Sequence, residues 1–140
     1  MTTLVVDSSI VPKWFFAEVH GAEAERIRAG NFDLVAPRFL LIELANIAVQ
    51  KVRRGIVPEA AGEELVANFQ ALPLDLVDDR PHLYEAYRLA RAYHPSVYDC
   101  LYAAVALHLG GQCVTADRRF YNAFAPAFPE TMLWVEDIPA

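Results

Sequence analysis

Four acidic residues of this 140-residue chain stand in surroundings that suggest a shared site. Asp7 and Asp117 each follow a short apolar run, whereas Glu43 and Asp99 lie within longer apolar stretches. A carboxylate among apolar residues is costly unless a partner compensates its charge. Four carboxylates brought together would need cations to hold them, and a ligand set made only of oxygen suits magnesium or manganese. The four acids therefore predict a site for a divalent metal ion.

Three of these acids also have a simpler interpretation as helix caps. Asp7 and Asp117 precede expected helices, and aspartate is a favoured N-cap that contributes about 1 kcal/mol. Ser96 and Asp99 have the serine-to-acid spacing of a capping box. Glu43 has no such role, because it is expected about two turns inside a helix, where no cap is needed. Its helical stripe continues with polar residues that form either the border of a pocket or an ordinary solvated seam: Asn46, Gln50, Arg53 and Arg54.

Short apolar strands that alternate with helices must position these acids, and prolines and glycines mark many of the boundaries. Strands are expected over 4–6, 34–36, 74–77, 112–115 and 132–135. Helices are expected over 8–16, 21–29, 37–54, 58–71, 81–93, 96–109 and 117–124. This alternation predicts one α/β domain over 1–140, with a short, mostly parallel central sheet flanked by helices on both faces. Ligands of such sheets gather beyond the carboxyl ends of the strands, where Asp7 and Asp117 fall.

Composition is compatible with a cytoplasmic protein that has a large core. Hydrophobic residues make up 55% of the chain, yet no apolar run approaches the roughly 18–20 residues of a membrane span. The start, Met1-Thr2-Thr3, lacks the basic segment of a secretory signal. Cys100 and Cys113 lie in apolar runs and are expected to be buried, reduced thiols. The net charge of −6 opposes nucleic-acid binding, but four of these charges are the candidate metal ligands, which leaves −2.

The order of the acids and the residues around them resemble the PIN-domain ribonucleases, most of all the VapC-type toxins of bacteria and archaea. The matching segments are Val5-Val6-Asp7-Ser8-Ser9, Glu43-Leu44-Ala45-Asn46, Tyr98-Asp99-Cys100-Leu101-Tyr102-Ala103-Ala104 and Thr115-Ala116-Asp117-Arg118-Arg119-Phe120. The resemblance runs from Leu4 to about Trp134. Some relatives carry a further acid just after the last aspartate, where this chain has Arg118-Arg119, so the resemblance does not extend to a full second metal site.

The resemblance implies a PIN-like fold and an endoribonuclease that uses Mg²⁺, or Mn²⁺, to hydrolyse RNA phosphodiester bonds. Asp7, Glu43 and Asp99 would be the main metal ligands, and Asp117 would complete the acidic ring. Three polar residues fall on the supporting positions of the family: Ser9, Asn46 and Thr115. The resemblance also implies a homodimer and a VapB-like antitoxin that restrains the toxin.

RNA binding would need positive charge beside the acids, because the RNA backbone is anionic. The candidate residues are Lys13, Arg38, Lys51, Arg53, Arg54, Arg118 and Arg119. The aromatic run Trp14-Phe15-Phe16 could stack bases, but such a run is core or interface material first.

Other functions are less compatible with these residues. The four histidines lack zinc-ligand spacing with each other or with the cysteines. An enzyme with an aspartyl nucleophile would need a second acid close to Asp7, and no glycine-rich phosphate loop is present. Two alternatives stay open, a PIN-like domain that only binds RNA or protein, and a stand-alone housekeeping nuclease without an inhibitor.

Overall fold

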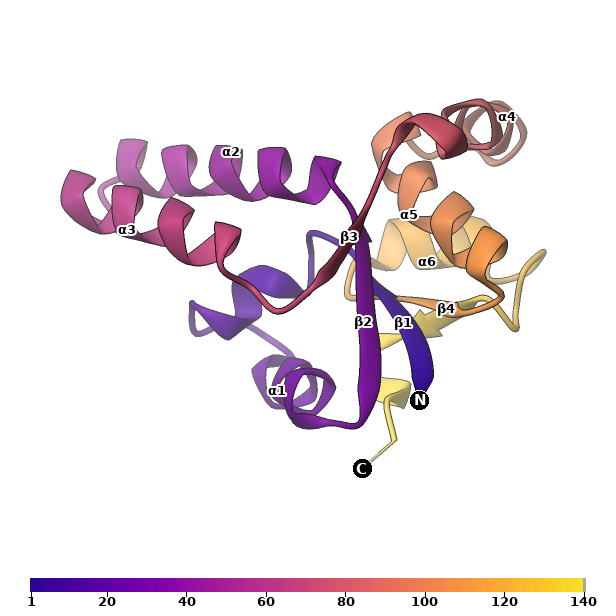
Figure 1. Ribbon diagram of the computed structural model, residues 1–140, viewed down its shortest axis with the longest axis horizontal. Coiled ribbons are helices and arrows are strands. Elements are labelled where there is room, and N and C mark those ends of the chain that lie inside the picture. The colour runs from indigo at the N-terminus through magenta and orange to yellow at the C-terminus, as the bar shows by residue number, and fades with distance from the viewer. Residues whose placement is uncertain (140) are drawn as a thin grey trace.

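A computed structural model describes residues 1–139 and places five strands in one parallel sheet. The strands are β1 (Thr2–Val6), β2 (Phe32–Pro37), β3 (Asp75–Val77), β4 (Gln112–Thr115) and β5 (Met132–Trp134). Their order across the sheet is β3-β2-β1-β4-β5, and every neighbouring pair is parallel. The carboxyl ends of all five strands therefore lie at one edge of the sheet. Figure 1 shows β1 and β2 running upward toward the start of α2.

Helices cover both faces of this sheet. The α-helices are α1 (Gly21–Ala29), α2 (Phe39–Arg53), α3 (Glu59–Gln70), α4 (Leu83–Tyr93), α5 (Val97–Leu109) and α6 (Arg118–Phe124). The short 3-10 helices are η1 (Val11–Trp14), η2 (Arg80–His82) and η3 (Val135–Asp137). Figure 1 shows α1 on one side of the sheet, α4 and α5 on the other, and the α2–α3 hairpin extending away from it. The predicted α/β architecture is confirmed.

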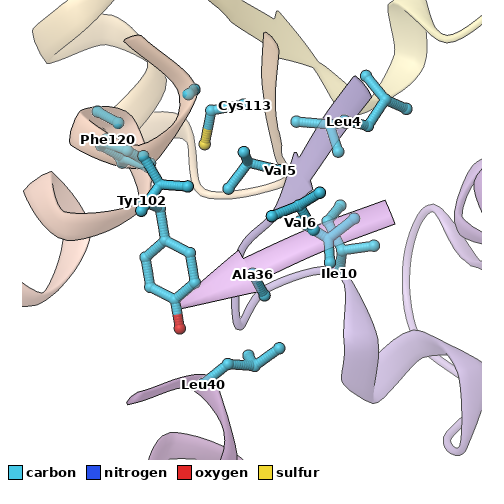
Figure 2. Close-up of a cluster of buried hydrophobic side chains, with 14 of the residues drawn as sticks. Leu4, Val5, Val6, Ile10, Ala36, Leu40, Tyr102, Cys113 and Phe120 are labelled. Carbon is cyan, nitrogen blue, oxygen red and sulfur yellow. The ribbon is translucent and has the colours of Figure 1, made fainter. Parts of the chain in front are cut away.

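The core is centred on β1 and α5. The last three residues of β1 are buried, and α5 is buried continuously from Cys100 to Ala106. A helix that is apolar all round is stable only when it is enclosed, and α5 packs directly on β1, β2 and β4. Figure 2 shows the Tyr102 ring reaching from α5 toward Leu40, with its hydroxyl oxygen at the leading end. The core thus delivers one polar atom to the region where α2 begins.

Local chemistry fixes where α5 starts and stops. The Ser96 hydroxyl accepts a hydrogen bond from the Asp99 amide at 3.2 Å, which is the N-cap half of the predicted capping box. Gly110 ends the helix in the left-handed region, with φ of 65°. Asp99 is thereby held in the first turn of α5, at the same edge of the sheet as the ends of β1 and β4.

Two expected boundaries are wrong. The helix expected over 8–16 is only the short helix η1, because Ser9 bonds back to the Asp7 side chain and turns the chain first. The helix expected from 37 begins at Phe39, because Pro37 is the last residue of β2. It lies beyond Val35, the last residue paired with β1, so its missing N–H costs no bond on that side. Glu43 therefore lies about one turn inside α2 rather than two.

The remaining boundaries agree to within a few residues. The expected strand over 132–135 ends at Trp134, and Val135 begins η3. The helix expected over 81–93 is split into η2 and α4. The predicted single domain extends to Ala140, which lies outside the described residues. In the part of the chain that is described, no helix has the length and apolar character needed to cross a bilayer.

Candidate active site

Asp7 directly follows β1 and is the most enclosed of the four acids, with 4% of its surface exposed. Its Oδ1 accepts hydrogen bonds from the Ser9 amide, at 3.0 Å, and from the Ser9 hydroxyl. Burial raises the pKa of Asp7 from 3.8 to about 7, although the hydroxyls of Ser9 and Thr115 act in the opposite direction. A buried carboxyl of this kind favours either a proton or a nearby cation.

Ser9 and Thr115 join the ends of the two central strands. The Ser9 hydroxyl accepts a hydrogen bond from the Ala116 amide at 2.8 Å and lies 3.4 Å from the Thr115 hydroxyl. Thr115 in turn accepts a hydrogen bond from the Asp117 amide at 3.0 Å. This network runs from Asp7 to Asp117 through two hydroxyl groups. Ser9 and Thr115 are therefore placed where their hydroxyl groups can orient Asp7 and the segment that carries Asp117.

Asp117 caps α6 and also belongs to the acidic group. Its Oδ1 accepts hydrogen bonds from the amides of Arg119 and Phe120, at 3.0 and 3.3 Å. The cap interpretation of this residue is therefore correct. A capping role does not exclude a role in the acidic site. Both cap bonds use Oδ1, which leaves Oδ2 free of them, and the charge of Asp117 still raises the pKa of Asp99.

Asp99 links the four acids electrostatically. Its pKa is raised from 3.8 to about 6, first by burial and then by the charges of Asp117 and Glu43. The Asp99 charge also helps to raise the pKa of Asp7. The Ser96 hydroxyl and the Arg119 charge act in the opposite direction on Asp99. The fold thus brings Asp7, Glu43, Asp99 and Asp117 within electrostatic reach of one another.

Glu43 is held by two hydroxyl groups whose contacts the sequence analysis did not anticipate. The Tyr102 hydroxyl donates a short hydrogen bond to Glu43 Oε1, and the Ser8 hydroxyl donates to Oε2 at 3.4 Å. Burial raises the pKa of Glu43, and these two bonds lower it. The position of Tyr102, three residues after Asp99 on the same helix, was the available signal, since residues at i and i+3 share a face.

The supporting role expected for Asn46 has less support from the geometry. Asn46 lies one turn beyond Glu43 on α2 and is exposed. Among residues 1–139, no hydrogen bond joins it to any of the four acids. Its role therefore stays a prediction.

The donor set fits a hard divalent cation, but the side chains are not closed around one. All four acids present oxygen, and two of them have pKa values of about 7 and 6, so a cation that favours the ionised forms would relieve a real cost. Within the described residues, however, no three acidic, histidine or cysteine side chains are grouped tightly enough to hold an ion. Glu43 accepts hydrogen bonds from Tyr102 and Ser8 on its two oxygens, and each oxygen keeps a further lone pair for a cation.

Three of the seven candidate cations are engaged in contacts with other side chains. Lys13 forms an ion pair with Glu18 at 3.2 Å, and Lys51 lies 4.5 Å from the centre of the Phe16 ring. Arg118 lies 3.7 Å from the centre of the Trp134 ring. Arg119 instead lines a cavity beside Asp99 and Asp117. Arg38, Arg53 and Arg54 are exposed at the two ends of α2.

Trp14 and Phe15 of the aromatic run pack against the core, as expected. The Trp14 indole donates to the Ala24 carbonyl at 2.8 Å, and Phe15 meets Phe69 edge to face with ring centres 5.0 Å apart. Cys100 and Cys113 are buried free thiols, also as expected.

Comparisons with known proteins agree with this geometry. A family model described as "PIN domain" matches residues 4–124. Ribonuclease VapC3 of Pyrobaculum aerophilum is 31% identical over 125 residues, which cover 86% of this chain and 94% of that protein.

Solved structures share the fold at lower identity. PAE2754 from Pyrobaculum aerophilum superposes with a TM-score of 0.72 at 23% identity, covering 96% of this chain and 85% of the other. VapC20 of Mycobacterium tuberculosis, described as a sarcin-ricin loop cleaving toxin, gives 0.66 at 18% identity, covering 86% and 95%. VapBC2 from Rickettsia felis, bound to a DNA fragment from its promoter, gives 0.67 at 12% identity, covering 95% and 98%. The chain therefore belongs to the PIN-domain family, in the group that contains the VapC ribonucleases.

Proposed function

We propose that this protein is a metal-dependent endoribonuclease, a VapC-like toxin that hydrolyses RNA phosphodiester bonds and is inhibited by a cognate antitoxin. The observation that carries the proposal is the convergence of four carboxylates from β1, α2, α5 and β4 on one edge of the sheet, with raised pKa values for Asp7, Glu43 and Asp99. Its relative VapC3 is a ribonuclease by name, and VapC20 is described as a toxin that cleaves the sarcin-ricin loop.

Asp7, Glu43, Asp99 and Asp117 would hold Mg²⁺ or Mn²⁺, which would supply Lewis-acid activation of a water and charge neutralisation at the scissile phosphate. The protein's own contribution is to position these acids. Ser9 and Thr115 fix Asp7 and Asp117 through hydrogen bonds between the strand ends. Tyr102 and Ser8 hold Glu43, and Asn46 is proposed to orient carboxylates or water.

The same acidic group provides the basis for inhibition by an antitoxin. Unpaired carboxylates attract any cation, including an arginine or lysine side chain of a partner protein. Such a side chain would neutralise the acids and exclude RNA. VapBC2 and a toxin–antitoxin complex from Klebsiella pneumoniae share the fold of this chain, which supports a VapB-like partner.

A homodimer is part of the proposal, because apolar residues remain exposed on two faces. Ile42 and Val49 are exposed on α2, by 65% and 42%, while Leu83, Tyr84 and Tyr98 are exposed near the starts of α4 and α5. Trp14 and Phe15, for which the sequence left a core or an interface role open, are packed against the core. A monomer mass by light scattering at tens of micromolar would contradict the homodimer. A cytoplasmic location is proposed on the same family basis.

A cleavage assay tests the nuclease directly. Purified protein is incubated with RNA in Mg²⁺ and in EDTA, and Asp7→Asn serves as the inactive control. Cleavage that needs Mg²⁺ and intact Asp7 is expected. RNA binding without cleavage would indicate the alternative of a PIN-like binding domain.

Expression in a bacterial host tests the toxin role separately. Wild-type protein should arrest growth, Asp7→Ala should remove the arrest, and co-expression of the antitoxin should do the same. An active enzyme that is harmless when overproduced would indicate a housekeeping nuclease instead.

A further inference from the structure

We propose that Arg119 binds an RNA phosphate beside the acidic site, in the cavity that opens next to Asp99 and Asp117. The inference rests on the nuclease function proposed above. It adds a residue that positions the substrate, which neither the acids nor their hydroxyl partners provide.

The cavity lies between the junction of α4 with α5 and one side of α6. It has a volume of about 380 Å³, and both acids line it. Its remaining walls come from Tyr93, His94, Pro95, Ser96, Arg119, Phe120 and Ala123. It is therefore a polar hollow that adjoins the proposed metal ligands, and an RNA strand that reaches these acids has space for its neighbouring backbone there.

Arg119 lines this cavity, and its guanidinium forms no ion pair among residues 1–139. Its positive charge is near enough to lower the pKa of Asp99. Among residues 1–139, however, its guanidinium is not within 4.0 Å of any carboxylate oxygen. The guanidinium group offers a planar pair of N–H donors that fits a phosphate in a bidentate way. Arg119 therefore carries free donors on the wall of a cavity next to the acids.

The neighbouring residue Arg118 has the same charge as Arg119 but lies in different surroundings. Its guanidinium lies 3.7 Å from the centre of the Trp134 ring and 5.9 Å from that of Tyr121, in a cation–π contact. It does not line the cavity. Two neighbouring arginines with the same charge are thus directed to different surroundings, which gives the chain its own matched control.

A different role for Arg119 must be separated from this one. Because it lowers the pKa of Asp99, it could act only as a counter-charge that keeps the acids ionised. In that case Arg119→Gln would change the affinity for Mg²⁺ but not the contact with RNA. A phosphate contact predicts instead a loss of RNA affinity that is shared by all sequences and depends on salt.

The experiment measures binding of a short fluorescent single-stranded RNA by anisotropy, in EDTA so that no metal-dependent cleavage occurs, at several salt concentrations. Arg119→Gln is expected to raise Kd about tenfold and to reduce the slope of log K against log salt by about 1. Arg118→Gln, with the same change of charge, should stay within about twofold, as for a cation remote from the ligand. Arg119→Lys should recover part of the affinity, because it keeps the charge but loses the bidentate geometry.

Equal losses in Arg118→Gln and Arg119→Gln would overturn the proposal, since only overall charge would then matter. An unchanged Kd in Arg119→Gln, with altered Mg²⁺ affinity by calorimetry, would overturn it in favour of the counter-charge role. Thermal melting confirms that each variant is folded.

Cleavage by the wild type in Mg²⁺ is scored separately. RNA binding that depends on Arg119, without any cleavage, would contradict the proposed nuclease function and support the phosphate contact. Cleavage by the wild type, together with equal RNA affinities in all variants, would contradict the Arg119 contact and support the nuclease function.

Discussion

The acidic site has two halves that are built differently. In the strand half, Asp7 and Asp117 are fixed by amide and hydroxyl bonds that run through Ser9 and Thr115. In the helix half, Glu43 and Asp99 project from α2 and α5, and Glu43 is held by two hydroxyls alone. The strand half is therefore set by the backbone of the sheet. The helix half has fewer fixing contacts, so we expect its side chains to adjust more readily when a ligand binds.

The largest expected effect comes from removing one acid from each half. Asp7→Asn and Asp99→Asn should each lower kcat for RNA cleavage by about a thousandfold, since an ion or its water would lose a ligand worth several kcal/mol. Asp137→Asn, an exposed acid in η3, is the control and should cleave normally. Steady-state kinetics measure this effect. A normal rate in Asp7→Asn or Asp99→Asn would show that the substituted acid is not needed for cleavage.

The two halves should also respond differently to pH in the absence of metal. The pKa of Asp7 is about 7 and that of Asp99 about 6, both above the usual 3.8. Between pH 3.8 and each raised pKa, the carboxyl is protonated in the native state and ionised in the unfolded state, so the native state binds more protons. The free energy of unfolding should therefore fall as the pH rises from about 4 to 7, and the Asp7 contribution is on the order of 4 kcal/mol.

Denaturant unfolding in EDTA across this pH range measures the slope. Asp7→Asn, which cannot titrate, should flatten the curve more than Asp99→Asn, because Asp7 is the more buried group. A slope unchanged in both variants would contradict the assignment of raised pKa values to these carboxyls.

Metal should stabilise the protein by drawing the halves together. Mg²⁺ or Mn²⁺ at about a hundred times its Kd should raise the free energy of unfolding by about 3 kcal/mol, because only the native state presents the complete ligand set. Differential scanning fluorimetry with and without EDTA detects this as a rise in Tm. The rise should vanish in Asp99→Asn and persist in Asp137→Asn. An equal rise in all three proteins would place the ion elsewhere.

The smallest expected effect separates the two neighbouring serines. Ser9→Ala removes the hydroxyl that serves Asp7, Thr115 and Ala116, and it should cost about 1–2 kcal/mol of stability and about tenfold in cleavage. Ser8→Ala removes only a 3.4 Å bond to Glu43 and should cost less than about 0.5 kcal/mol. Urea unfolding and initial rates compare the two variants. Equal costs would mean that the strand half is no better fixed than the helix half.

The sequence predicted the layout of the fold and the identity of the family, because these depend on local patterns. Apolar runs gave the five strands, and proline and glycine gave most helix ends. The start of α2 was predicted two residues too early, since a proline can close a strand as well as open a helix, and Pro37 does the former. The four acids were found because carboxylates in apolar surroundings are rare.

The parts of the site that could not be predicted depend on tertiary packing. The spacing from Asp99 places Tyr102 on the same helix face, but only the fold shows that its hydroxyl meets Glu43, a residue 59 positions away. Arg118 and Arg119 look equivalent in the sequence, and only the position of Trp134 shows which of them faces away from the cavity. Side-chain direction is set by such distant contacts, so the role of each cation emerges only with the fold.

The strand order has a consequence for how the protein is made. β1 lies at the centre of the sheet, but its partner β4 is among the last strands to be synthesised, and the bond from Ala116 to Ser9 joins residues 107 positions apart. At roughly 5–20 residues per second, the ribosome needs about 5–20 s to bridge that interval. Asp7 and Glu43 are therefore synthesised well before Asp117, and the hydrogen-bond network that joins Asp7 to Asp117 can form only when most of the chain has been made.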